Sequence, residues 1–387
     1  MTEIDLTPQY AFGTNATKAL DTFIKKNHFD SVLVLLGKTS SVKSGAWEQV
    51  LKVLEENNTK YVEYKDVKSN PRDFDIIKAA KLGIENKVQF VIALGGGSIM
   101  DTAKVVTTFI SNPDLNDVRA FFEDQSIAKN LPIPVVTIPL TAATASENNA
   151  FVVINLTDKA ETEKVFYKIP ACIPSLCIQD PNYIKTNSDW HVAAGLFDAF
   201  CHNEEQYFGR DTFSWTQKFQ FMNTDNLLEH GPEFLKDRNN DVAASNLLWT
   251  ASMSFNPLSG FNSDADWSVH ALEHALSAKW DVTHGAGLAL VMPTYLKLRS
   301  AKEAWFREKA IVWAKSTFGV DTIEAMLEKL TEFIGSIGLP LKWSDFKEIG
   351  QKPTAEEIHS LVGIVRRTVN PAIDDEFIYQ VFDSIPA

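Results

Sequence analysis

The sequence predicts an α/β domain built on a parallel sheet, followed by an all-α domain. Short apolar runs alternate with helical patterns in the first half, which is typical of parallel strands covered by helices on both faces. From about Asp180 onward the apolar spacing is helical and convincing strand alternation is absent. A chain of 387 residues is also long enough for two domains. We therefore expect one domain over residues 1–180 and a second over residues 181–387.

Apolar runs in the first half predict strands, and the segments between them predict helices. Runs rich in Val, Leu and Ile that end at glycine or proline are expected to be buried strands. The expected strands cover residues 31–37, 60–67, 88–98, 133–139 and 175–181, and the expected helices cover 45–57, 71–86 and 100–110. In the second half, helical spacing is found over residues 189–208, 212–231, 241–255, 264–280 and 355–369.

Composition and charge exclude several classes of function. The net charge of −13 repels phosphates, so we expect neither a nucleic-acid partner nor an anionic membrane surface. No apolar run approaches the ~18 residues of a membrane-spanning helix, and the N-terminal stretch lacks the features of a secretory signal. The three cysteines form no CxxC pair and are odd in number. We therefore expect a cytoplasmic protein with reduced thiols.

A glycine-rich turn joins an expected strand to an expected helix in ALGGGSIMDTAK, residues 93–104. Glycines let a backbone approach a phosphate closely, and the amides that open the following helix face the anion. The spacing departs from the dinucleotide fingerprint, because Met100 stands where the third glycine belongs. From spacing alone, a Rossmann-like nucleotide-binding turn and a plain turn between strand and helix remain equally open.

The loop GKTSS, residues 37–41, also ends a strand and contains no acidic residue. An acidic residue at the end of such a strand binds the ribose hydroxyls of NAD and repels the 2′-phosphate of NADP. Thr39, Ser40, Ser41 and Lys43 offer hydrogen-bond donors to a 2′-phosphate instead. The alternative is a polar loop without a ligand, which is preferred unless a cofactor is assigned.

Histidines concentrate in VHALEHALSAKWDVTHG, residues 269–285. His270 and His274 are four residues apart and share a helix face. His284 is expected at or just past the end of that helix. The same stretch contains no HExxH motif, because the Glu of HALEH does not directly follow a histidine.

A second pair, Asp198 and His202, has four-residue spacing on another apolar helix. Imidazoles and a carboxylate are suitable ligands for Zn²⁺ or Fe²⁺. The alternatives are core histidines with satisfied hydrogen bonds and a simple contact along one helix face. Two such elements in otherwise apolar regions favour a metal site with the ligands Asp198, His202, His270 and His284. His274 is then not needed as a ligand.

The combination of a glycine-rich turn and an Asp/His cluster resembles the iron-dependent (group III) alcohol dehydrogenases, over nearly the whole chain. The motifs that carry the resemblance are FGTNATKAL (12–20), GGGSIMDTAK, IPLTAATASE (138–147), GLFDAFCHNEEQY and HALEHALSAKWDVTHG. Within the family, LLGKTSSVKSGAWEQVL (35–51) and DADWSVHALEHAL resemble the NADPH-dependent butanol dehydrogenase and aldehyde reductase branch. The resemblance implies a dehydroquinate synthase-like architecture.

The resemblance also implies cofactors and site residues. NADP(H) is favoured over NAD(H), because relatives that use NAD tend to carry an Asp in the 37–41 loop. One divalent metal, Fe²⁺ (or Zn²⁺), is implied at the four ligands named above, with His274 as the catalytic residue in a proton relay. The implied cofactor-binding residues are Thr39, Ser40, Gly95, Gly96, Gly97, Ser98, Asp101, Thr141, Thr144, Asn149 and Lys164.

The implied activity is hydride transfer between NADP(H) and a small aldehyde or primary alcohol, by a homodimeric enzyme. A polyol dehydrogenase of the glycerol or propanediol type, another relative on the same scaffold, a non-catalytic nucleotide-binding protein and a structural zinc protein are the alternatives. We expect an apolar substrate wall from Phe151, Phe255, Phe261 and Trp267, although ordinary core packing explains each of them singly. The chain departs from the family at Leu140, Ala143 and Ala145, where a threonine and two glycines are common.

Overall fold

The computed structural model describes residues 8–159, 162–210, 213–368 and 373–387. The chain forms two compact units, one of Met1–Asn187 with Arg238–Ser252 and one of Ser188–Asp237 with Met253–Ala387. The first unit contains a parallel sheet and the second is helical, which confirms the predicted fold class. A division into domains at 180/181 stays a prediction.

The sheet of the first unit has six strands, which pair in parallel throughout. Their spatial order is β1 (Gln9–Phe12), β8 (Leu176–Gln179), β5 (Val135–Pro139), β4 (Phe90–Gly95), β2 (Ser31–Leu36) and β3 (Lys60–Tyr64). The sequence indicated five of these strands and missed β1. It also missed an antiparallel hairpin of β6 (Phe151–Leu156) and β7 (Glu163–Lys168).

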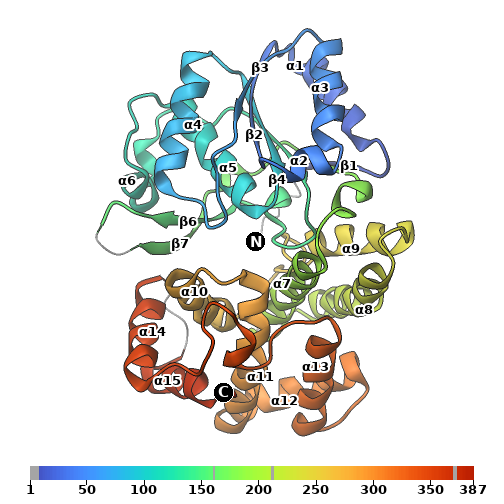
Figure 1. The fold of residues 1–387 in the computed structure, drawn as a ribbon, viewed down its shortest axis with the longest axis vertical. Helices are drawn as coiled ribbons and strands as arrows, with labels where there is room; N and C mark the ends of the chain where they lie inside the picture. Colours follow the sequence, from blue (N-terminus) through green and yellow to red (C-terminus); the bar gives the residue numbers. More distant parts are fainter. Residues whose placement is uncertain (1–7, 160–161, 211–212, 369–372) are drawn as a thin grey trace. The chain divides into compact units, whose positions relative to one another are not determined.

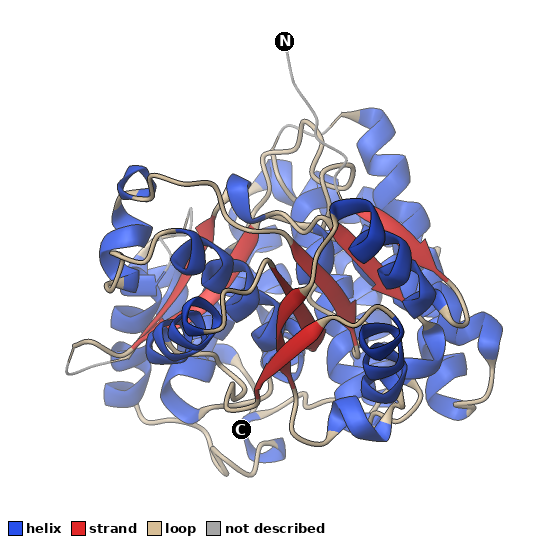
Figure 2. Cartoon of the chain, turned by 90° about the horizontal axis from the view of Figure 1, so that it is seen from above, coloured by secondary structure: helices blue, strands red, loops and turns tan. Residues whose placement is uncertain are grey.

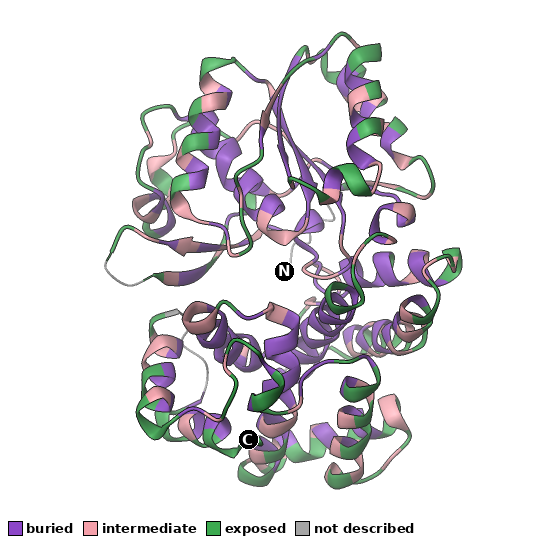
Figure 3. Cartoon of the chain, in the orientation of Figure 1, coloured by how far each residue is buried: buried purple, intermediate pink, exposed green. Residues whose placement is uncertain are grey.

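Helices cover both faces of this sheet, as Figures 1 and 2 show. Side chains of β2 alternate between two apolar cores, because successive residues of a strand point to opposite faces. Val32 and Val34 pack with α1 (Ala19–Asn27) and α3 (Ala46–Glu56). Leu33 packs on the other face with α4 (Asp73–Glu85) and α5 (Gly97–Ser111). The central strands are buried along their whole length (Figure 3).

The carboxyl ends of neighbouring strands fall at one edge of the sheet. Leu36 at the end of β2 is in register with Leu94 of β4, and Gly95 is in register with Pro139 of β5. The segments 37–41, 95–97 and 140–145 therefore leave the same edge. In open parallel sheets this edge is where ligands bind.

Helices make up the second unit, together with short 3₁₀ turns and loops. They are α7 (Asp189–Tyr207), α8 (Ser214–Lys236), α10 (Ser268–Trp280), α11 (His284–Lys302), α12 (Ala304–Phe318), α13 (Ile323–Ser336), α14 (Ala355–Thr368) and α15 (Asp375–Ser384). Helix α9 (Asp241–Met253) belongs almost entirely to the first unit. Residues 212 and 369, at the ends of two predicted helices, lie outside the described residues. Among the described helices, none has the length and apolar character that spanning a membrane requires.

Ala145 has a left-handed backbone, with φ of 52°. A side chain in this conformation costs about 1 kcal/mol, and glycine removes that cost. We predict that Ala145→Gly raises the free energy of unfolding by about 1 kcal/mol, measured by urea denaturation. Ala143 is absent from the residues with positive φ, so Ala143→Gly is a matched control that we expect to be neutral or destabilising. Equal effects of the two substitutions would contradict the strain at Ala145.

Candidate metal centre and nucleotide-binding edge

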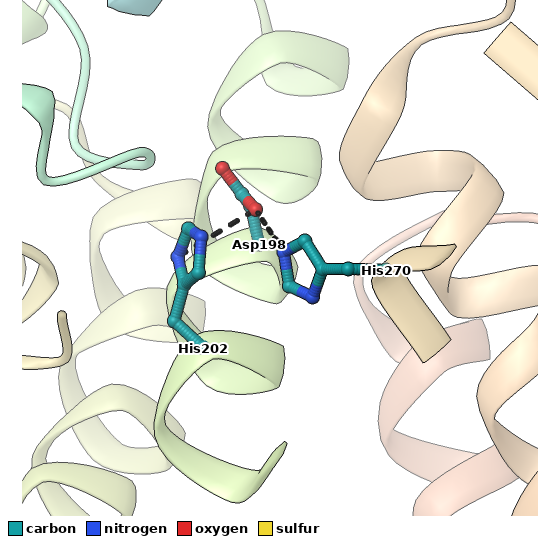
Figure 4. Close-up of side chains that lie close together, drawn as sticks. All are labelled: Asp198, His202 and His270. Atoms are coloured by element: carbon teal, nitrogen blue, oxygen red, sulfur yellow. Dashed lines mark ion pairs between the residues drawn. The ribbon is translucent and has the colours of Figure 1, made fainter. Parts of the chain in front are cut away.

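Three imidazoles converge on one carboxylate oxygen in the second unit. Asp198 Oδ1 lies 3.7 Å from His202 Nδ1, 3.6 Å from His270 Nε2 and 3.5 Å from His284 Nε2. Figure 4 shows the carboxylate of Asp198 between the rings of His202 and His270. Asp198, His202 and His270 are buried, and His284 is partly exposed. The structure thus brings the four predicted metal ligands together.

Three helices supply these side chains. Asp198 and His202 share a face of α7 through their four-residue spacing, and His270 lies in the first turn of α10. His284 lies just past the end of α10, as predicted, and it is the first residue of the next helix, α11. Gly285 follows it, and a Cβ there would lie 1.9 Å from the Ala194 carbonyl oxygen. A glycine is therefore required for α11 to approach α7 so closely.

The ligand atoms have the character that a metal site requires. Among the described residues, none forms a hydrogen bond with Asp198 Oδ1, His202 Nδ1 or His270 Nε2, although all three atoms are buried. Buried polar atoms without a partner are costly, and their convergence identifies a place where a cation would satisfy them together. The residues present therefore fit a divalent metal ion.

The protonation states of His202 and Asp198 agree with this fit, whereas His270 must lose a proton. Burial lowers the pKa of His202 to about 3, so at neutral pH its imidazole is uncharged and has a lone pair to donate. Burial also acts to lower the pKa of His270, but the carboxylates of Glu205 and Asp198 together outweigh it and raise that pKa to about 10. Burial acts to raise the pKa of Asp198, and the surrounding imidazoles hold it below its usual value. Asp198 is therefore ionised, and a metal ion that binds His270 displaces a proton.

Two carboxylates that the sequence analysis missed bind the far nitrogens of the ligand imidazoles. Glu205 on α7 accepts a hydrogen bond from His270 Nδ1, and Glu273 on α10 accepts one from His284 Nδ1. Such partners fix the ring orientation and direct the other nitrogen toward the metal. Glu273 is the Glu of HALEH, and its role was missed because HALEH does not match the HExxH motif. Glu205, three residues after His202, offered only the signal of an acidic residue in an apolar helix.

His274 lies beside the ligand cluster. Its ring centroid is 5.6 Å from that of His284 and 6.4 Å from that of His270, and the side chain is buried. It also belongs to a group with Glu273 and His284 whose ligand atoms lie within 4.8 Å of one another. His274 thus lies directly beside the cluster, next to His270 and His284. This placement is compatible with the predicted separation of its role from metal binding.

Two aromatic side chains of the predicted substrate wall pack on the ligand histidines. Phe255 stacks on His202 with ring centroids 4.9 Å apart, and Trp267 meets His270 edge-on at 5.5 Å. Phe261 instead packs on the exposed Phe213, and Phe151 stacks on Phe166 within the β6–β7 hairpin of the first unit. Of the four predicted wall residues, Phe255 and Trp267 therefore contact the ligand cluster.

The glycine turn of the first unit lies at the carboxyl edge of the sheet. Gly95 ends β4, and Gly97 and Ser98 begin α5, whose opening amides lack acceptors within the helix. Thr141 and Thr144 pack against this turn, since a Cβ on Gly97 would lie 2.7 Å from Thr144 Cγ2 and one on Gly96 3.4 Å from Thr141 Oγ1. The turn and the 141–144 segment thus form one surface.

Other predicted cofactor residues serve the structure of this region. Asp101 is buried and accepts hydrogen bonds from Ser146 Oγ at 2.5 Å and from the Val153 amide at 2.9 Å. Asn149 donates to the Ala145 carbonyl at 2.8 Å and so supports the left-handed turn there. Both side chains join α5 or β6 to the 141–149 segment. A direct contact of either with a cofactor stays a prediction.

The remaining predicted cofactor residues lie on two separate elements. Thr39 and Ser40 begin the one-turn helix α2 (Ser40–Lys43), directly after β2. Lys164 is buried on β7, where it is in register with Asn155. Thr39 and Ser40 therefore share the carboxyl edge with the glycine turn, whereas Lys164 comes from the hairpin.

Two family models match consecutive parts of the chain. The model described as iron-containing alcohol dehydrogenase matches residues 7–181. The model for the C-terminal part of the Fe-containing alcohol dehydrogenase family matches residues 192–366. The first match contains the glycine turn, and the second contains Asp198 and the three imidazoles that converge on it.

Relatives that match most of the chain are named for different nicotinamide cofactors, NADH and NADPH. The chain is 30% identical to NADH-dependent butanol dehydrogenase B of Clostridium acetobutylicum, over 89% of this chain and 88% of that protein. It is also 30% identical to NADPH-dependent aldehyde reductase YqhD of Escherichia coli, over 82% of each. The crystal structure of E. coli YqhD covers 100% of this chain and 99% of its own, with a TM-score of 0.88 at 26% identity.

A further solved structure supports the fold. NADH-dependent butanol dehydrogenase A of Thermotoga maritima aligns with a TM-score of 0.90 at 23% identity, over 100% of this chain and 99% of that one. At this identity the likeness is evidence for the fold alone.

Glu273 provides a test of the carboxylate–imidazole arrangement. Glu273→Gln keeps the shape of the side chain but removes the charge behind His284, so we predict a metal affinity about 10- to 100-fold weaker. Metal titration of the apoprotein measures it. Glu328→Gln is the matched control, because Glu328 is an exposed acid on α13, outside the clusters that could hold a metal ion. An unchanged affinity in Glu273→Gln would show that the carboxylate does not support the site.

Proposed function

Because this chain belongs to the iron-containing alcohol dehydrogenase family, we propose that it transfers a hydride between NADP(H) and a small aldehyde or primary alcohol at a divalent metal site. Family membership makes it an oxidoreductase of the alcohol dehydrogenase type. The substrate, the metal and the nicotinamide cofactor are the parts of this proposal that need experiment.

The convergence of His202, His270 and His284 on Asp198 carries the proposal. A core histidine needs only its own hydrogen bonds, whereas these rings face one carboxylate oxygen at nearly equal distances. Two of the rings are also held from behind by Glu205 and Glu273. This carboxylate–imidazole arrangement is typical of metal ligands.

The ligand set supports Fe²⁺, with Zn²⁺ as the second candidate. Four protein ligands around tetrahedral zinc make a closed structural site, and catalysis needs a further coordination position. Iron accepts more than four ligands, so it fits a catalytic role at these side chains. When bound, the metal supplies Lewis-acid polarisation of the carbonyl oxygen. The chain's own contribution is to hold the ion in place with oriented side chains, of which Asp198 is ionised and His202 is uncharged, while His270 gives up a proton.

The first unit supports the cofactor assignment. The glycine turn with the start of α5 suits a pyrophosphate, and Thr39 and Ser40 lie one strand away, where the adenosine ribose would fall. The 37–41 loop has no acidic residue to repel a 2′-phosphate. We therefore favour NADP(H), although one relative with NADH in its name and one with NADPH are both 30% identical to this chain.

Side chains near the ligands support an apolar aldehyde rather than a polyol. Phe255 and Trp267 pack on the ligand rings and present carbon surface, which binds an alkyl chain and excludes water. A polyol substrate would favour polar side chains at these positions. We assign to His274 the transfer of a proton to the substrate oxygen, because its imidazole lies beside those of His270 and His284.

The protein's setting is part of the proposal. All three cysteines are buried and free of disulfides, which fits the reducing cytoplasm. A homodimer stays a prediction from the family resemblance.

Cofactor-coupled turnover tests the proposed activity. We predict oxidation of NADPH with short aldehydes such as butanal, loss of turnover after chelation, and recovery with Fe²⁺ or Zn²⁺. Absorbance of the reduced nicotinamide follows the reaction. Turnover that survives complete metal removal would contradict the metal-dependent mechanism, and equal use of NADH would contradict the cofactor preference.

Two histidine variants separate metal binding from proton transfer. His270→Ala removes a ligand, so we predict loss of bound metal together with activity. His274→Ala is expected to retain metal but to lower kcat by about 100-fold, the usual scale of general acid catalysis. Metal analysis and steady-state kinetics of the two purified variants measure this. Loss of metal from His274→Ala would show that the two roles are not separate.

A further inference from the structure

Asp66, which follows the neighbouring strand β3, forms an ion pair with the loop 37–41, which itself contains no acidic residue. Strands β2 and β3 are adjacent and parallel, with Leu35 in register with Tyr64, so the segments after them leave the sheet side by side (Figure 1). Asp66 lies two residues past the end of β3. Its Oδ1 is 3.2 Å from Nζ of Lys38, and both side chains are largely exposed, at 72% and 68%.

This pair lies next to the place where a dinucleotide would bind. Strand β2 pairs with β4 on its other side, and the Gly37 amide donates to the Leu94 carbonyl at 3.4 Å. The 37–41 loop is thus adjacent to the glycine turn that follows β4. A dinucleotide whose pyrophosphate occupies that turn extends its adenosine ribose toward the neighbouring strand end. Lys38 and Asp66 would then flank the ribose 2′ position.

The two charges act in opposite directions on a 2′-phosphate. Lys38 attracts it, whereas Asp66 repels it and also neutralises Lys38. NADH has no 2′-phosphate, and the Asp66 carboxylate is already paired with Lys38, so the two charges act less on NADH than on NADPH. The composition of the loop 37–41 alone indicates a site that accepts the 2′-phosphate of NADPH. The ion pair, however, places the negative charge of Asp66 beside that loop.

We propose that Asp66, through its ion pair with Lys38, is a specificity-determining residue that limits the preference for NADPH over NADH. The proposal rests on the proposed function, because it presumes a nicotinamide dinucleotide on the first unit. Exposed ion pairs contribute little to stability, so the pair is not needed to hold the fold.

Charge-neutralising variants test Asp66 and Lys38 separately. For Asp66→Asn we expect the Kd of NADPH to fall about fivefold while the Kd of NADH changes less than about twofold. For Lys38→Met we expect the Kd of NADPH to rise by a similar factor. In the double variant the Asp66→Asn effect shrinks, because part of it acts through the lysine. Binding is measured by titration of the full-length protein, without turnover.

Glu85→Gln is the matched control. Glu85 is exposed at the carboxyl end of α4 and precedes β4, so it lies near the opposite edge of the sheet. Its substitution by Gln changes the net charge by the same amount as Asp66→Asn. We expect it to leave the ratio of the two Kd values unchanged. The Asp66→Asn effect is also expected to diminish at about 0.5 M salt, where exposed charges are screened.

The outcomes separate this inference from the proposed function. If the wild type binds a cofactor and the ratio of the Kd values in Asp66→Asn equals that in Glu85→Gln, Asp66 is not a specificity determinant. Equal strengthening of NADH and NADPH would overturn it as well, since that is a general charge effect. If neither wild type nor variants bind NADH or NADPH, the proposed function fails and this inference fails with it.

Discussion

The buried charge of Asp198 is the constraint on which the second unit depends. An ionised carboxylate removed from water is strongly destabilising unless oppositely polarised groups surround it. Here the surrounding groups come from three helices, with His202 on α7, His270 on α10 and His284 on α11. These helices must pack with their ligand faces inward, and Figure 3 shows them to be mostly buried. Gly285, at the contact between α7 and α11, is part of the same requirement.

Charge compensation continues outward from the ligands. Glu205 holds His270 Nδ1 and also accepts the amides of Val269 and His270, so one carboxylate both orients a ligand and caps the helix that carries it. The Glu205 carbonyl in turn accepts the Asp266 amide at 2.9 Å, and Asp266 forms a buried ion pair with Arg299 of α11 at 2.7 Å. The position of His270 is thus determined by its ion pair with Glu205 and by a backbone hydrogen bond that joins Glu205 to the Asp266–Arg299 pair. This explains why so many acidic residues occur inside an otherwise apolar helical unit.

Sequence periodicity identified the parts of the site that share one helix. Asp198 and His202 are visible as a pair because four-residue spacing places them on one face. The partners Glu205 with His270 and Lys38 with Asp66 were not predictable in this way, because each joins residues that only strand register or helix packing brings together. The β6–β7 hairpin was missed for a different reason. Strand β6 (FVVINL) is apolar along most of its length and did carry a strand signal, whereas its partner β7 (EKVFYK) is mixed in polarity and has no continuous apolar run.

The unit boundary at Ser252 shows the same limit of local sequence. Residues 241–255 have one helical pattern, yet the chain changes unit after Ser252. Asn148 donates to the Ser252 carbonyl at 2.8 Å within the first unit, whereas Gln206 donates to the Ser254 carbonyl at 2.6 Å within the second. The carbonyls that end α9 are therefore satisfied by side chains distant in sequence. These distant hydrogen-bond partners, rather than a glycine or proline in the local sequence, mark the place where the chain passes from the first unit to the second. The local amino-acid sequence therefore does not locate this boundary.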